Sequence, residues 1–125
     1  MFINCNPNPN GNRVGDCVIR AISIASDSEW EEIYINLAIQ GYIMKDMPSS
    51  NHVWSSYLMS KGFDRKVVDD ICPDCFTIEE FCKFNPKGTY ILATGTHVVA
   101  AIDGDYYDTW DSGDEVPIFY FKKGE

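Results

Sequence analysis

The chain has 125 residues, of which 45% are hydrophobic and 14% aromatic, so it can bury a core within one domain spanning residues 1–125. Nineteen acidic residues against ten basic ones give a formal net charge of −9, which repels phosphate backbones and argues against nucleic-acid binding. We therefore expect a peptide or protein partner, and a basic one fits best. The N-terminal residues lack the pattern of a signal peptide, and no run of about eighteen apolar residues predicts a membrane span. A cytoplasmic location away from membranes is the expectation.

The first part of the chain predicts a loop followed by a helix. Residues 4–12 are mostly Asn, Pro and Gly, which favour turns, so this segment is expected to be an ordered loop or a frayed end. From 17 to 25 the apolar residues follow helical spacing. Because several of these residues are β-branched and have modest helix propensity, burial must stabilise the helix.

Two further helices are predicted before the middle of the chain. Ser28 and Glu31 have the spacing of a capping box, with Asp27 as an alternative cap, and Gly41 is the expected stop signal. Apolar residues three and four apart predict the next helix over 51–60.

The second half of the chain changes to a strand pattern. After a short strand at 64–68, Thr77 and Glu80 form another capping-box pair and predict a short helix. Runs of β-branched and aromatic residues separated by turn signals then predict strands over 89–93, 96–102, 106–110 and 116–121. Helices followed by an antiparallel sheet make an α+β fold.

Cys17 follows a flexible Gly15-Asp16 step and is expected in the first turn of its helix. Unpaired backbone N–H groups and the positive end of the helix dipole stabilise negative charge at such a position. A cysteine there is expected to have a lowered pKa and to react as a thiolate.

His97 lies on a predicted strand whose hairpin partner carries carboxylates. If residues 103–104 form a two-residue turn, His97 falls opposite Trp110, with Asp111 one position further along. A three-residue loop would instead place Asp111 directly opposite His97. In either register Asp111 lies near the imidazole, whereas Asp108 is about three residues nearer the turn, so Asp111 is the preferred orienting acid. A thiol, an imidazole and an acid in this order fit a nucleophile, a base and a group that orients the base.

These motifs, Gly15-Asp16-Cys17, His97-Val98-Val99 and Trp110-Asp111-Ser112, resemble those of compact papain-like cysteine peptidases. The layout is similar to that of bacteriocin-leader peptidases and of small papain-like proteins of Firmicutes and their phages. The resemblance implies N-terminal helices packed on a C-terminal antiparallel sheet, and a Cys17–His97–Asp111 triad that needs no cofactor or metal. It also implies cleavage of peptide, isopeptide or amide bonds through a thioester, with transfer to another acceptor as a variant.

The resemblance further implies a polar side chain about six residues before the nucleophile, usually Gln, that completes an oxyanion hole. Gly11 occupies that position here. Asn12 is the preferred substitute, ahead of Asn10 and Asn6, together with the backbone N–H of Cys17. The missing Gln also supports an alternative, in which the chain is a catalytically inactive papain-like binding module, phage-borne and engaging a host protein.

The spacing of the remaining cysteines gives only weak support for a zinc site. Cys72 and Cys75 have the two-residue gap of zinc knuckles, and Cys82 follows them. A fourth ligand would have to be Cys5 or His52, both distant in sequence. Separate thiols are therefore preferred, with a transient Cys72–Cys75 disulfide as another reading, and no metal is expected.

Overall fold

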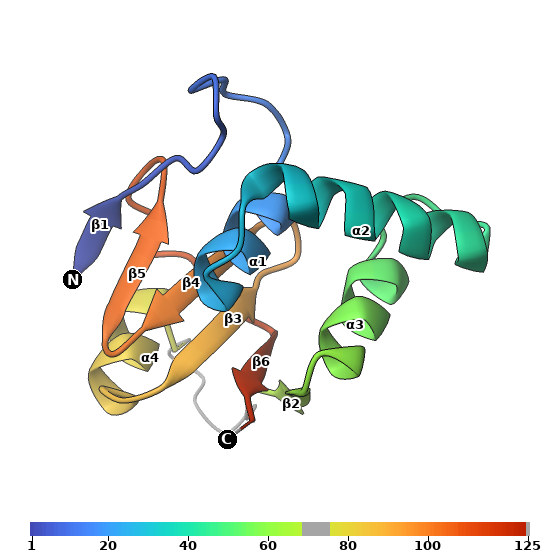
Figure 1. The fold of residues 1–125 in the computed structure, drawn as a ribbon. Helices are drawn as coiled ribbons and strands as arrows, with labels where there is room; N and C mark the ends of the chain where they lie inside the picture. Colours follow the sequence, from blue (N-terminus) through green and yellow to red (C-terminus); the bar gives the residue numbers. More distant parts are fainter. Residues whose placement is uncertain (69–75, 125) are drawn as a thin grey trace.

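The computed structural model describes residues 1–68 and 76–124, and within them four helices pack against a six-stranded sheet (Figure 1). The fold is therefore α+β, as the sequence predicts. The helices are α1 (Cys17–Ser26), α2 (Trp30–Met44), α3 (Asn51–Ser60) and α4 (Ile78–Phe84). The strands are β1 (Phe2–Asn4), β2 (Phe63–Val67), β3 (Thr89–Ala93), β4 (Val98–Ile102), β5 (Asp105–Asp108) and β6 (Phe119–Lys123).

The sheet is mixed rather than antiparallel throughout. Its strand order is β1-β5-β4-β3-β6-β2, and β1 runs parallel to β5, with Phe2 paired to Tyr106 and Asn4 to Asp108. The other strand pairs are antiparallel. The expectation of a purely antiparallel C-terminal sheet is therefore wrong at this edge, because three residues are too few to show a strand pattern in the sequence.

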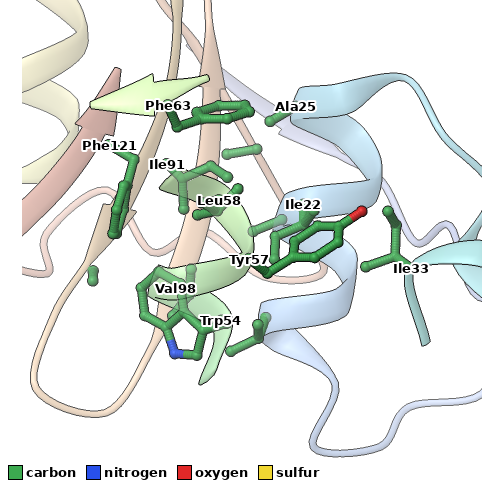
Figure 2. Close-up of a cluster of buried hydrophobic side chains, with 14 of the residues drawn as sticks. Ile22, Ala25, Ile33, Trp54, Tyr57, Leu58, Phe63, Ile91, Val98 and Phe121 are labelled. Carbon is green, nitrogen blue, oxygen red and sulfur yellow. The ribbon is translucent and has the colours of Figure 1, made fainter. Parts of the chain in front are cut away.

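On one face of the sheet α1 and α3 pack against the strands, and α2 packs on these two helices, so that the three helices build the larger hydrophobic core (Figures 1 and 2). Ile22 of α1, Trp54 of α3 and Phe121 of β6 are each fully buried there. Trp54 packs its indole on Phe119 and Phe121, with ring centroids 5.7 and 5.4 Å apart. Burial of this kind stabilises the β-branched α1, whose own helix propensity is modest.

The opposite face of the sheet packs on α4. Strand alternation divides β4 between the two cores: Val98 and Ala100 belong to the core of α1, while Val99 and Ala101 belong to the core of α4. This double burial explains why β4 is apolar at every one of its five positions. Helix α1 packs on β4 through the side chains of Val98 and Ala100.

Most predicted helices agree with the structure, but α2 differs at both ends. The helix over residues 51–60 is confirmed, as is the capping box between Thr77 and Glu80. In contrast, Glu29 is the N-cap of α2, without a side-chain cap bond, and the helix passes through Gly41. Gly41 is needed for close approach rather than as a stop, since a Cβ there would lie 2.7 Å from the carbonyl oxygen of Asp46.

The hairpin between β4 and β5 takes the shorter of the two predicted registers. Ile102 pairs with Asp105 across a two-residue turn, and Asp103 and Gly104 have φ values of 49° and 86°. Positive φ at both central residues is the signature of a type I′ turn. Since β4 begins at Val98, His97 lies just before the strand, and strand alternation does not determine its orientation.

Candidate active site

Cys17 is the first residue of α1 and is partly exposed. The ring of His97 and the backbone N–H of Val98 both lie within hydrogen-bonding reach of its sulfur, so α1 and the beginning of β4 meet at the thiol. The expected meeting of a helix-borne thiol and the His97 imidazole is therefore present, although the imidazole comes from the residue just before β4 rather than from the strand itself. The arrangement can supply a nucleophile with a base in direct contact.

The second ring nitrogen of His97 contacts the carboxylate of Asp108. Its Nε2 lies 2.6 Å from Oδ2 of Asp108, which leaves Nδ1 as the ring nitrogen available to Cys17. The imidazole is largely buried, and the indole of Trp110 lies over it with the ring centroids 5.0 Å apart. This covering shields the His97–Asp108 pair from water.

Asp108 is held by four donors and is only 2% exposed. Besides His97, its Oδ2 accepts the hydroxyl of Ser112 at 2.7 Å. Its Oδ1 accepts the backbone N–H of Thr109 at 2.8 Å and lies 3.4 Å from a guanidinium nitrogen of Arg20. The acid that orients His97 in the structure is therefore fixed in both position and charge.

The preference for Asp111 as the orienting acid is a sequence prediction that the structure corrects. The carboxylate of Asp111 accepts the hydroxyl of Tyr106 at 2.6 Å and the backbone N–H of Gly113 at 3.0 Å, away from His97. Because β5 ends at Asp108, the chain after it turns off the hairpin and carries Asp111 into a separate loop. Counting along an extended ribbon therefore placed the wrong carboxylate at the imidazole.

The electrostatics of the site favour a thiolate–imidazolium pair. Burial opposes charge on His97, but its hydrogen bonds with Asp108 and Cys17 outweigh this and raise the pKa of the imidazole to about 9. Burial likewise opposes the thiolate of Cys17, yet hydrogen bonds from His97 and Val98 and the charge of Arg20 lower the pKa of the thiol. Between these two pKa values the sulfur is negative and the ring is positive, as an activated cysteine requires.

A buried charged network continues from Asp108 into α1. Arg20 donates to the carboxylate of Asp16, which also accepts the indole N–H of Trp30 at 2.9 Å. Arg20 and Asp16 are 7% and 4% exposed. The site is thus connected through Arg20 to the beginning of both α1 and α2.

Asn12 is predicted to help form an oxyanion hole. Among the residues that the structure describes, no hydrogen bond of Asn12 supports this role. Asn12 is exposed, and its backbone N–H donates to the side chain of Asn8 at 3.3 Å, while its carbonyl accepts from Asn6. Asn8 is the buried asparagine of this loop and also accepts the N–H of Asn10. These asparagines order the loop before Cys17, and the amide that faces the oxyanion stays a prediction.

Cys5 and Cys82 differ from Cys17. Burial raises the pKa of Cys5, and burial raises the pKa of Cys82 to about 11. Cys72 and Cys75 lie outside the described residues. Within the described ranges no three His, Cys, Asp or Glu side chains gather as a metal site.

Arg20 is the site residue that the sequence analysis missed, although a signal was present. Arg20 is charged within an otherwise apolar helical stripe, four residues after Asp16 and three after Cys17. Residues at these spacings lie on one face of a helix. A charged residue at a core-facing position predicts a buried partner, because an unpaired buried charge is costly.

Comparison with known proteins does not assign a family. No family model matches the chain, and neither curated proteins nor solved structures give a significant match. Across residues 1–68 and 76–124, no helix combines the length and the apolar character needed to cross a membrane.

Proposed function

We propose that this protein is a papain-like thiol hydrolase with a Cys17–His97–Asp108 triad. The observation that carries the proposal is the continuous contact from the sulfur at the tip of α1, through the imidazole, to a buried carboxylate 2.6 Å away. The lowered pKa of Cys17 and the raised pKa of His97 add the charge state that such chemistry requires. The fold is consistent with this class.

In the proposed reaction the thiolate of Cys17 attacks a carbonyl carbon, and the tetrahedral intermediate collapses to a thioester. The His97 imidazolium donates its proton to the leaving amine. His97 then takes a proton from water, which attacks the thioester and releases the acid and the free thiol. Asp108 keeps Nε2 of the ring engaged, so that Nδ1 faces the sulfur.

Peptide, isopeptide and related amide bonds are the proposed substrates, with transfer to an amine acceptor as a variant of the same chemistry. The net charge of −9 favours a basic substrate. A mostly apolar pocket of about 260 Å³ lies beside the beginning of α1 and supports an apolar side chain near the scissile bond; its lining includes Gly15, Val18, Ile19, Tyr34, Leu37 and Met47.

The first test is selective alkylation with iodoacetamide at pH 6, followed by mass spectrometric mapping. Cys17 should label at least about tenfold faster than Cys5 and Cys82, because only its pKa is lowered. His97→Ala should remove the advantage of Cys17. Equal, slow labelling of all three thiols would contradict the proposal and favour the inactive binding module.

The second test is acyl transfer from p-nitrophenyl acetate, which needs no knowledge of the physiological substrate. Wild-type protein should release p-nitrophenolate and show an acetyl group on Cys17 by peptide mapping. Cys5→Ala is the matched control and should acylate normally, whereas Cys17→Ala should not acylate at this site. Acylation that spreads evenly over the thiols would count against a built active site.

A further inference from the structure

The side chain of Asp16 does not cap the helix that it precedes. Asp16 is the N-cap residue of α1, yet it makes no side-chain hydrogen bond to the first turn. Its carboxylate is directed instead to Arg20 and to the indole N–H of Trp30. Asp is among the residues that most favour N-capping, but here its carboxylate has other partners.

Arg20 is one of these partners and spans two acids at once. One guanidinium nitrogen binds Asp16 and the other lies 3.4 Å from Asp108, with all three side chains nearly fully buried. The planar fork of arginine can hold two carboxylates in fixed directions, which a lysine ammonium cannot do equally well.

We propose that Arg20 is a positioning residue that keeps the carboxylate of Asp16 away from the N-terminus of α1 while holding Asp108 toward His97. The inference rests on the proposed function, since it assigns Arg20 a role in preparing the same triad. Arg20 acts through Asp16 and Asp108 and does not touch the substrate.

The consequence for Cys17 follows from helix electrostatics. A capping carboxylate would accept the N–H of Val18 or Ile19 and would bring negative charge into the turn that carries the thiolate. With Asp16 held by Arg20, those N–H groups and the positive end of the dipole remain available to the sulfur and to an oxyanion.

The charged groups around the sulfur come from three elements. Arg20 and Asp16 belong to α1 and its cap, His97 precedes β4, and Asp108 ends β5. His97 and Arg20 favour the thiolate. Asp16 and Asp108 are the negative groups whose placement determines how much of that stabilisation the sulfur receives.

The test compares Arg20→Gln with the double variant Asp16→Asn/Arg20→Gln. The readout is the pH midpoint of the rate at which Cys17 reacts with iodoacetamide, with labelling followed by peptide mapping. In Arg20→Gln the freed Asp16 carboxylate moves to the cap, so the midpoint should rise and labelling at pH 6 should fall about tenfold, which corresponds to one pKa unit. Adding Asp16→Asn should recover most of that loss, because the cap is then neutral.

A second pair of variants keeps a positive charge at position 20 and so guards against misfolding. Arg20→Lys should show a smaller rise of the midpoint, and Asp16→Asn/Arg20→Lys should reverse it. Equal midpoints in a single variant and its double would overturn the proposal, as would a wild-type midpoint in Arg20→Lys. A merely structural role would lower the thermal unfolding temperature, measured in parallel by circular dichroism, without this Asp16-dependent recovery.

These outcomes are separable from failure of the proposed function. The alkylation midpoint of Cys17 can be measured whether or not the protein is acylated by p-nitrophenyl acetate. Absence of acylation with the predicted order of midpoints would reject the hydrolase and keep the role of Arg20. Normal acylation with unchanged midpoints would reject the role of Arg20 and keep the hydrolase.

Discussion

Asp108 contacts His97 although the two residues are not direct partners in the hairpin. Ala100 pairs with Tyr107, so Asp108 stands one step beyond that pair, while His97 stands three residues before Ala100. The 2.6 Å contact is therefore diagonal, across the open end of the β4–β5 ribbon. Diagonal neighbours on adjacent strands lie within reach of long side chains, and a histidine just outside the strand is free to turn toward one.

The acid assignment is tested by Asp108→Asn and Asp111→Asn. Asp108→Asn should lower the rate of Cys17 acylation by about 10²- to 10⁴-fold, because His97 loses the carboxylate that orients it and stabilises its charge. Asp111→Asn should change that rate by less than about twofold, since its carboxylate contacts Tyr106 and Gly113. A larger loss in Asp111→Asn than in Asp108→Asn would reverse the assignment.

Ser112 offers a graded version of the same experiment. Its hydroxyl is fully buried and donates to Asp108 at 2.7 Å. Ser112→Ala removes one of four donors, so the pKa of Asp108 should rise and the acylation rate should fall less than in Asp108→Asn. Urea unfolding should show a loss of about 1–3 kcal/mol, the usual cost of losing a buried hydrogen bond to a charged group. Unchanged rate and stability would contradict this network.

The pH dependence of the site follows from two opposite pKa shifts. As pH rises through the lowered pKa of Cys17, the thiolate forms and alkylation by iodoacetamide increases. His97 keeps its proton up to about pH 9 and stabilises the thiolate below that value. Hydrolysis of an amide, which needs a proton for the leaving amine, should therefore decline as pH rises through about 9. His97→Ala should move the alkylation midpoint upward, and a midpoint unchanged by this substitution would exclude the ion pair.

Cys17→Ala should abolish acylation and leave the fold intact. The side chain is small and lies at the tip of a helix, partly exposed, so its removal opens no large cavity. Far-ultraviolet circular dichroism and the thermal unfolding midpoint should match those of wild type within a few degrees. A collapsed spectrum for this variant would instead assign Cys17 to the core.

Trp54→Ala should destabilise the protein by about 3–5 kcal/mol, the range for removing a fully buried aromatic side chain. Tyr42→Ala is the matched control, because Tyr42 is 76% exposed on α2, and its substitution should change stability by less than about 0.5 kcal/mol. Urea unfolding followed by circular dichroism measures both. Similar losses in the two variants would mean that the aromatic cluster around Trp54 is not the main core.

The sequence predicts local features of this fold better than long-range ones. The capping box at Thr77, the helix over 51–60 and the two-residue turn at 103–104 depend on neighbouring residues, and each is present. Strand β1 depends on its pairing with β5, about a hundred residues away, which the local pattern does not contain.

The same distinction applies to the site. Cys17 and His97 are predicted from local context, and the structure brings them together. The choice between Asp108 and Asp111 depends on where β5 ends and how the following loop turns, which spacing along the chain does not specify. Arg20 joins two carboxylates 92 residues apart, and only the folded chain shows that pairing.

The backbone around the acid is secured by strand β1. Asn4 pairs with Asp108, and the N–H of Cys5 donates to the carbonyl of Asp108 at 2.8 Å. The position of the carboxylate that binds His97 therefore depends on the three-residue strand β1 at the edge of the sheet. An affinity tag for enzymatic work should therefore be placed at the C-terminus. Strain or fraying in residues 2–4 would displace Asp108 before it disturbed the hydrophobic core.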